Sequence, residues 1–228
     1  KHTLTKYGPN EVAVLVSAQL SNEELYYIRR IFGDYLRIDK IESRVSSNAA
    51  VYSDDFLVTA DKNPNTRGLQ ILLPRGSGCG KLLHDCAEGV IHFLYIFQHD
   101  LTLGYDSKEV AEALSKVSCV VFQGPWDHAT AALADIQLPS AVYAEKDGTF
   151  TNVQNLVQRF HAAVPPPGEA LPDLEILHRL GGEIGASLTG TSAAEVLLEI
   201  GQTVEAFIGT TWQTVGSGGR PLSIISRK

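Results

Sequence analysis

The sequence predicts an α/β fold, namely a doubly wound, mostly parallel sheet with helices on both faces, followed by a helical C-terminal tail. Apolar runs at 11–17 and 90–97 are typical of strands buried on both faces, as in parallel sheets covered by helices. Segments with helical periodicity alternate with strand-like runs through residue 140. This alternation requires right-handed crossovers and therefore gives a parallel sheet.

The first helix is expected to begin after Ser21. Ser21 is its predicted N-cap, and Glu24, at the third helical position, completes a capping box. Apolar residues at 25, 28, 31 and 32 share one face of this helix, and Gly33 is expected to end it. We interpret 34–41 as a short second strand and 42–55 as a polar loop.

The rest of the α/β unit follows the same alternation. An element is expected to begin at 56–59, and 69–73 is again apolar. A helix at 81–88 ends at Gly89, and the run at 90–97, the most apolar of all, is expected at the centre of the sheet. A helix at 107–114, capped by Ser107, leads into a strand at 117–123.

The segment from 130 to 150 contains a helical turn, a strand and a hairpin in this interpretation. Residues 130–133 form the turn, and a strand at 136–138 is stopped by Pro139. Apolar residues on both sides of Asp147-Gly148 favour a tight hairpin in which Gly148 takes a positive φ.

Consecutive prolines divide the chain. The stretch at 164–172 is expected to be a stiff, extended linker. We therefore predict an α/β domain at 1–163, the linker at 164–172 and a helical extension at 173–228. The extension contains a helix at 173–180 capped by Asp173 and interrupted at Gly181-Gly182, then a helix at 191–207 capped by Thr191 or Ser192. Their apolar faces must pack back onto the first domain.

Composition excludes several classes of function. The formal net charge is −7 and no basic cluster is present, which argues against a nucleic-acid partner. No apolar run is long enough to span a membrane, so no direct membrane insertion is expected. The chain contains no methionine and begins at Lys1, so we expect it to be a piece of a longer gene product or a processed chain.

The three cysteines do not form a recognisable metal site. Cys79, Cys86 and Cys119 are odd in number and lack Cys-x-x-Cys spacing, which indicates reduced thiols in an intracellular protein. Iron–sulfur clusters usually take four thiolates, most of them closely spaced. We therefore predict no metal site.

Two short motifs invite a chemical interpretation. The glycine-rich stretch at 76–81 lacks one residue of P-loop spacing, has Leu82 in place of the hydroxyl that binds magnesium, and fails as a dinucleotide fingerprint. A flexible βα turn is favoured, with a phosphate role as the alternative.

Asp127 and His128 suggest a general base, but no nucleophile is identifiable beside them. His99-Asp100, at the end of a strand, is better placed for function, whereas His92 is expected to be packed.

The segment 133–152 carries a family signature. Leu-Ala-Asp-Ile-Gln-Leu-Pro at 133–139, followed by Glu-Lys-Asp-Gly-Thr-Phe-Thr-Asn at 145–152, resembles the molybdopterin oxidoreductase superfamily. Within it the chain is similar to the large iron–sulfur subunit of NADH-quinone oxidoreductase, respiratory complex I. Similar motifs of that subunit follow at 167–177, 194–200 and 209–219, so the resemblance covers nearly the whole chain.

The resemblance implies a role and a set of site residues. The family motif Thr-Asn-x-Glu-Gly-Arg-x-Gln has Gln154, Asn155 and Leu156 in place of its Glu-Gly-Arg core, and Leu156 cannot grip a phosphate as Arg does. No catalytic residue is therefore expected. The matching positions are weak candidates for cofactor contact: Glu145, Gly148, Thr149, Asn152, Gln158 and Arg159.

The resemblance also implies partners and a location. We expect a non-catalytic docking domain that holds no cofactor, in a subunit whose iron–sulfur clusters lie outside this region. Its partners would be other subunits of the peripheral arm of the NADH-quinone oxidoreductase, on the cytoplasmic side of the inner membrane. Two alternatives stay open: part of a molybdopterin-dependent oxidoreductase such as a formate dehydrogenase, or a standalone binding module.

Overall fold

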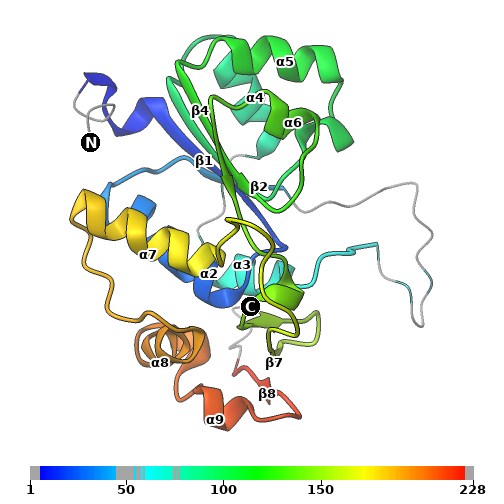
Figure 1. Cartoon of the computed structure of the whole chain (residues 1–228), viewed down its shortest axis with the longest axis vertical. Helices are drawn as coiled ribbons and strands as arrows, with labels where there is room; N and C mark the ends of the chain where they lie inside the picture. Colours follow the sequence, from blue (N-terminus) through cyan, green and yellow to red (C-terminus); the bar gives the residue numbers. More distant parts are fainter. Residues whose placement is uncertain are drawn as a thin grey trace, which may run out of the picture.

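Five parallel strands form the central sheet in the order β2-β1-β3-β4-β5 (Figure 1). The computed structural model describes residues 6–44, 54, 58, 60–73, 76 and 78–223. The strands are β1 (Val12–Ser17), β2 (Ile41–Arg44), β3 (Phe93–Phe97), β4 (Cys119–Gly124) and β5 (Ile136–Pro139). This order confirms the predicted doubly wound α/β fold, with the apolar strand β3 at the centre.

Helices cover both faces of the sheet and give it two hydrophobic cores. On one face α4 (Cys79–Ala87), α5 (Ser107–Ser115) and α6 (Ala129–Ala132) pack against alternate strand residues such as Leu94 and Phe122 (Figure 1). On the other face α2 (Asn22–Ile28) and α3 (Thr66–Leu72) pack against the opposite set, including Tyr95 and Phe97. Because successive strand residues point to opposite faces, every residue of β1 is buried.

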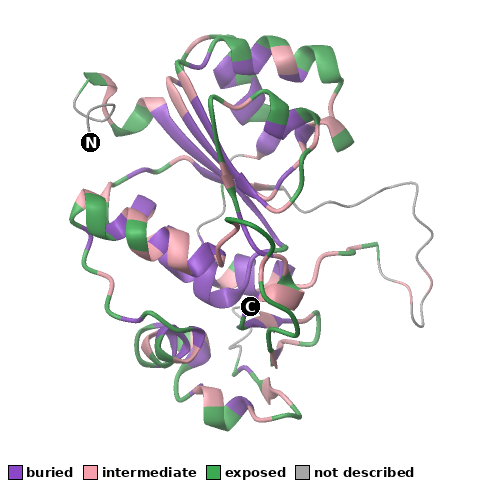
Figure 2. Cartoon of the chain, viewed as in Figure 1, coloured by how far each residue is buried: buried purple, intermediate pink, exposed green. Residues whose placement is uncertain are grey.

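Helix α2 is buried along its whole length. It contacts both the α/β domain and the helices of the C-terminal tail. All seven of its residues are buried (Figure 2). Its predicted capping box is confirmed, since the Ser21 hydroxyl accepts from the Glu24 N–H and the Glu24 carboxylate accepts from the Ser21 N–H. The prediction that Gly33 ends the helix was wrong. The backbone continues as a π-helix, η2 (Arg29–Tyr35), in which the Leu36 N–H bonds to Ile31 O.

The predicted hairpin lies further along the chain than expected. Residues Tyr143–Glu145 form a 3₁₀ turn, η4, and Gly148 begins strand β6 (Gly148–Thr151) without a positive φ. Strand β6 pairs antiparallel with β7 (Leu156–Phe160), and Asn155 in their turn takes the left-handed conformation, with φ of 62°. Asn tolerates this conformation better than most residues. Tail strand β8 (Arg220–Pro221) pairs with β7 and completes this small sheet.

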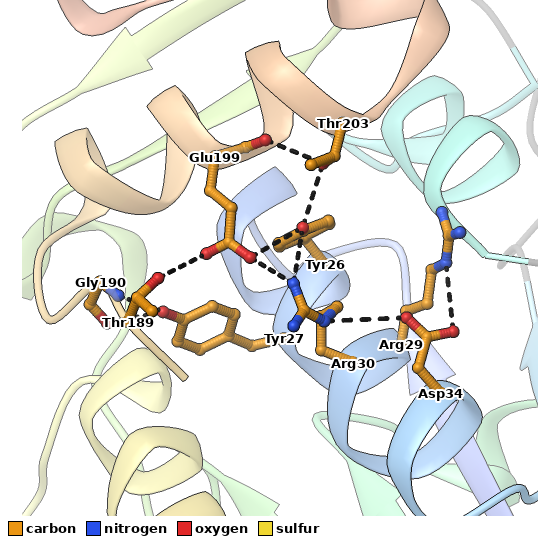
Figure 3. Close-up of polar contacts among 9 residues, drawn as sticks. All are labelled: Tyr26, Tyr27, Arg29, Arg30, Asp34, Thr189, Gly190, Glu199 and Thr203. Atoms are coloured by element: carbon orange, nitrogen blue, oxygen red, sulfur yellow. Dashed lines mark hydrogen bonds and ion pairs between the residues drawn. The ribbon is translucent and has the colours of Figure 1, made fainter. Parts of the chain in front are cut away.

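The tail packs back onto α2, as its apolar faces predicted. Helices α7 (Asp173–Ile184) and α8 (Ala193–Thr203) contribute Leu177 and Ile200 to the core around α2. Short elements η5 (Glu205–Phe207) and α9 (Trp212–Val215) follow. Figure 3 shows the polar contacts of this junction, in which the Tyr27 hydroxyl donates to Gly190 O over 2.6 Å and Arg30 pairs with Glu199.

Several predicted boundaries need correction. Strand β2 begins at Ile41, so 34–41 is not the strand, and 69–73 lies largely in helix α3. Helix α7 runs through Gly181-Gly182, and its N-cap is Pro172 instead of Asp173. Asp106, and not Ser107, caps α5. The element expected at 56–59 lies, apart from residue 58, outside the described residues. Within the described ranges no helix has the length and apolar character needed to cross a membrane.

Candidate functional site

A pocket lies at the carboxyl edge of the parallel sheet, at the switch point between β1 and β3. In open α/β sheets ligands gather there, because loops leave neighbouring strands toward opposite faces. The pocket has a volume of about 450 Å³. We call it the edge pocket; its lining comes from the loops after β1, β3, β4 and β5 and from β6: Gln19, Gln98, Pro125, Trp126, Val142, Tyr143, Ala144, Lys146 and Phe150.

A buried ion cluster lies at the same edge of the sheet. It includes Lys146, which also lines the edge pocket. Lys146 Nζ lies 2.8 Å from the Glu24 carboxylate, which comes from α2. It also lies 2.5 Å from the carboxylate of Asp173, the first residue of α7. The side chains of Glu24, Lys146 and Asp173 are 1%, 4% and 0% exposed. Helix α2, helix α7 and the segment that carries Lys146 are therefore joined by one cation and two carboxylates, all shielded from water.

Amide side chains from the sheet complete the cluster. Gln98 and Gln123 each donate to Asp173, both over 2.8 Å, and the Tyr95 hydroxyl donates to Gln123 Oε1 over 2.8 Å. Gln98 follows β3 with φ of 48°, an unusual conformation for a residue other than glycine. The carboxylate of Asp173 is thus held by three donors, from Lys146, Gln98 and Gln123.

Burial and the neighbouring charges shift the pKa values of Glu24 and Lys146. Burial raises the pKa of Glu24, and Lys146 opposes this rise while the second carboxylate adds to it. Burial alone would lower the pKa of Lys146, but the carboxylates of Asp173 and Glu24 raise it above its ordinary value. Lys146 is therefore the shared ion-pair partner of the two carboxylates.

A second buried carboxylate joins α2 to the hairpin. Glu23 accepts from the Thr149 N–H over 2.9 Å and from the Thr149 hydroxyl over 2.7 Å. Asn22 donates to the same hydroxyl, over 2.9 Å. Burial raises the pKa of Glu23 to about 7, while the hydrogen bonds from Thr149 oppose the rise. Strand β6 is therefore fixed to α2 by polar groups that are shielded from solvent.

A second hollow, of about 440 Å³, lies between the two tail helices and the ion cluster. Glu24 and Lys146 line it, together with His178 of α7 and Ser192 at the start of α8. Its walls carry charges of both signs, and Glu175 and Arg179 already pair with each other. Lys146 thus lines both this hollow and the edge pocket.

The structure gives three of the predicted site residues internal roles. Glu145 accepts from the Val142 N–H and closes its own 3₁₀ turn. A Cβ at Gly148 would lie 2.6 Å from the Phe160 ring and 3.0 Å from Ser21, so this position requires glycine. Thr149 is bound by Glu23 and Asn22.

The other three predicted residues lie along the hairpin. Asn152 accepts from the N–H groups of Gln154 and Leu156 and so shapes the turn, and its amide donates to Gln158. Arg159 pairs with Thr149 in the strand register and donates to Trp212 O in the tail. Gly148, Thr149, Gln158 and Arg159 thus lie in strands β6 and β7, while Asn152 lies in the turn between them and Glu145 lies in η4 before them. None of the six positions lines the edge pocket.

The remaining motifs hold no catalytic constellation among the described residues. His128 Nδ1 accepts from the Ala131 N–H as the cap of α6 and lies 3.9 Å from Asp100, whereas Asp127 is exposed. Asp100 accepts from the hydroxyls of Thr102 and Thr130. In the glycine-rich segment, parts of which lie outside the described residues, the Gly78 N–H donates to Glu42.

Sequence reasoning missed most of the cluster. Glu24 and Asp173 were predicted as helix caps, and Lys146 was noticed as part of the signature alone. Gln98 and Gln123 carried no signal beyond their place at strand ends. For Glu24 the available clue was the run of four large, mainly apolar residues that follows it at 25–28, because a carboxylate that is buried with its helix needs a cationic partner.

Comparison with known proteins identifies the family. Residues 67–183 match the model of the molybdopterin oxidoreductase family, so the chain belongs to this family. It is 38% identical over 142 residues to the F420-dependent formate dehydrogenase 2 subunit alpha of Methanococcus maripaludis, covering 61% of this chain and 21% of that protein. The F420-dependent formate dehydrogenase subunit alpha of Methanocaldococcus jannaschii is 36% identical over 132 residues, covering 57% and 20%.

The chain spans about a fifth of the length of these relatives. The resemblance to the molybdopterin oxidoreductase superfamily is thereby confirmed. These relatives do not support the narrower resemblance to a complex I subunit, because they carry the names of formate dehydrogenase α subunits.

The family implies a pterin cofactor, and a site for a pterin dinucleotide at the sheet edge needs groups that hold its phosphates. Proteins hold phosphate with cationic side chains or backbone N–H groups. Of the described residues that line this pocket, Lys146 is the one Lys or Arg, and its Nζ is already bound by two carboxylates. Pro125 offers no N–H donor. The edge pocket therefore has no Lys or Arg side chain among its described lining that is available to phosphate.

Proposed function

We propose that this chain is one domain of the large subunit of a redox enzyme of the molybdopterin oxidoreductase family, and that it serves there as a docking and scaffolding domain without a cofactor of its own. Electron transfer would be carried by other parts of the complex, as expected for an NADH-quinone oxidoreductase. The observation that supports this is the ion cluster: the cation at the sheet edge is bound by Glu24 and Asp173, which leaves it unable to receive an anionic cofactor.

Two further observations support a structural role. The family's Glu-Gly-Arg core is replaced by Gln154, Asn155 and Leu156, and these residues form the turn and first strand position of the β6–β7 hairpin. Asn155 supplies the positive φ, and Arg67 donates to its side chain over 2.7 Å. The hairpin thus keeps its shape while the position that would present an Arg presents a half-buried Leu.

A second candidate is a domain of a pterin-containing formate dehydrogenase, and the named relatives favour it over the complex I assignment. In that case the parent protein would hold molybdenum or tungsten with a pterin, and other segments would supply the phosphate-binding groups that the edge pocket lacks.

The experiment that separates the candidates is elemental analysis of the parent protein purified from its native cells. The docking proposal predicts no molybdenum or tungsten in stoichiometric amount and no pterin fluorophore released on denaturation. Stoichiometric metal together with the fluorophore would overturn it and establish the second candidate.

A further inference from the structure

The edge pocket is flanked by two large aromatic side chains that lie open to solvent. Trp126 is 67% exposed and Tyr143 is 66% exposed. Trp126 also lines a smaller adjacent hollow of about 260 Å³, so its ring stands between two depressions of the surface. Trp and Tyr dominate the binding energy of protein interfaces when they lie beside pockets. This arrangement is typical of a surface that a partner covers.

The charged residues beside the pocket are mainly acidic. Asp127 is exposed next to Trp126, and Glu145 is half-buried beside Tyr143. Asp147 is not counted with them, because it lines the hollow between the tail helices and lies 3.4 Å from His161. Between Gly124 and Phe150 the sequence contains no Lys or Arg except Lys146, whose charge is neutralised inside the cluster. Asp61 and Lys62, next in sequence to the Asn63 that Gln19 contacts, contribute one charge of each sign. Asp127 and Glu145 therefore leave an excess of negative charge at the described rim.

The acidic rim and the apolar walls together select the occupant. An anionic ligand would be repelled, and a second copy of this chain would bring a net charge of −7 against the same sign. A basic protein segment gains from the rim and can place an apolar side chain against Pro125, Trp126 and Phe150.

We propose that the edge pocket docks a protein partner through one large apolar side chain that enters beside Trp126 and Tyr143, with Lys or Arg residues on its flanks facing Asp127 and Glu145. This inference rests on the proposed docking function and names the kind of partner that the site takes. The exposed aromatic side chains would supply most of the affinity, and the acidic residues would supply specificity and association rate.

Selection from a phage library of random peptides on the immobilised 228-residue chain tests this proposal. The selected peptides are expected to carry one Trp, Phe, Tyr or Leu with at least two Lys or Arg close by. Their binding should weaken at least about tenfold in Trp126→Ala and in Tyr143→Ala, as for interface hot spots. Leu198→Ala, which removes an exposed apolar side chain of α8, is the matched control and should leave binding unchanged.

The acidic rim is tested with the same peptides. Asp127→Asn should weaken binding at low salt and reduce its dependence on salt, whereas Asp147→Asn, in the other hollow, should leave binding unchanged. Peptides that lack basic residues, binding that is equal in Trp126→Ala, or no enrichment at all would overturn the inference. A chain that selects no peptide while its parent protein contains no pterin defeats this inference alone, whereas stoichiometric molybdenum and pterin defeat the proposed function.

Discussion

Two polar clusters connect helix α2 to the C-terminal tail, and they differ in their access to water. In the first, Glu24 meets Lys146 and Asp173, whose side chains are nearly inaccessible. In the second, shown in Figure 3, Arg30 of η2, directly after α2, meets Glu199 of α8, with side chains 32% and 19% exposed. Both contain an ion pair, and both hold a tail helix.

The difference in burial decides what each cluster contributes. Removing one partner of a buried ion pair leaves an uncompensated charge in a poor solvent and typically costs about 3–5 kcal/mol. A partly exposed pair is stabilised by water when it is broken, so its loss costs about 1 kcal/mol or less. The buried cluster therefore contributes most to the stability of the sheet edge. The contacts of α8 contribute less, and their contribution depends on salt.

The largest expected effect follows from removing the buried cation. Lys146→Met leaves Glu24 and Asp173 facing each other, so we expect the free energy of unfolding to fall by about 3–5 kcal/mol. Denaturant titration at neutral pH measures this loss. Lys108→Met, which removes an exposed lysine of α5, is the matched control and should change stability by less than about 0.5 kcal/mol.

The same cluster offers a rescue. Replacing its three charged groups together, as Glu24→Gln, Lys146→Met and Asp173→Asn, removes the unpaired charges and should restore much of the stability lost in Lys146→Met. A triple variant that is no more stable than Lys146→Met would show that the loss arises from packing and not from charge.

Glu23 gives stability a dependence on pH. Its pKa is about 7 in the folded chain against an ordinary 4.5, so the folded state binds the proton more tightly than the unfolded state. The stability that Glu23 contributes, about 3 kcal/mol, should be fully present below pH 4.5, fall between pH 4.5 and 7 and be lost above pH 7.

The variant Glu23→Gln tests this assignment because it remains neutral and keeps the hydrogen-bonding shape. We expect it to be more stable than the natural chain at pH 8 and similar to it near pH 4.5, as measured by denaturant titration across pH. Identical pH profiles for both chains would assign the titration to another group.

A smaller effect is expected in the exposed cluster. Glu199→Gln weakens the interaction with Arg30 and with the Tyr26 hydroxyl, which donates to Glu199 over 3.0 Å. The expected loss is about 1 kcal/mol at low salt and less at high salt. A double-mutant cycle with Arg30→Ala measures the coupling, and a value as large as that of the buried cluster would remove the distinction between the two.

The smallest expected effect lies in the hairpin turn. Asn155→Gly relieves the positive φ of this position but loses the bond from Arg67, so the two contributions nearly cancel and stability should change by about 0.5 kcal/mol or less. Asn155→Ala keeps the strain and loses the bond, and should be less stable than the glycine variant by thermal unfolding.

The sequence predicted those parts of the fold that depend on local patterns. Strand β3, the capping box at Ser21 and the apolar faces of the tail helices were all predicted, because each is set by residues that are neighbours in the chain. The hairpin was misplaced because Asp147-Gly148 has turn composition, whereas the Asn152 side chain shapes the real turn.

The ion cluster could not be predicted in the same way. A capping position explains Glu24 and Asp173 locally, and only the folded chain shows that both carboxylates share Lys146. The π-helix after α2 was missed for a similar reason, since a glycine at position 33 is a normal helix end and the wider turn is maintained by tertiary packing of Ile31 and Phe32.

The cation at the sheet edge is already satisfied by the carboxylates of Glu24 and Asp173. Calorimetric titration of the 228-residue chain with pyrophosphate tests this directly, because pyrophosphate is the charged part of a pterin dinucleotide. We predict no saturable binding at millimolar concentrations. Saturable binding that is lost in Lys146→Met, with the fold of that variant verified by circular dichroism, would show that Lys146 is available to an anionic ligand and would contradict the account.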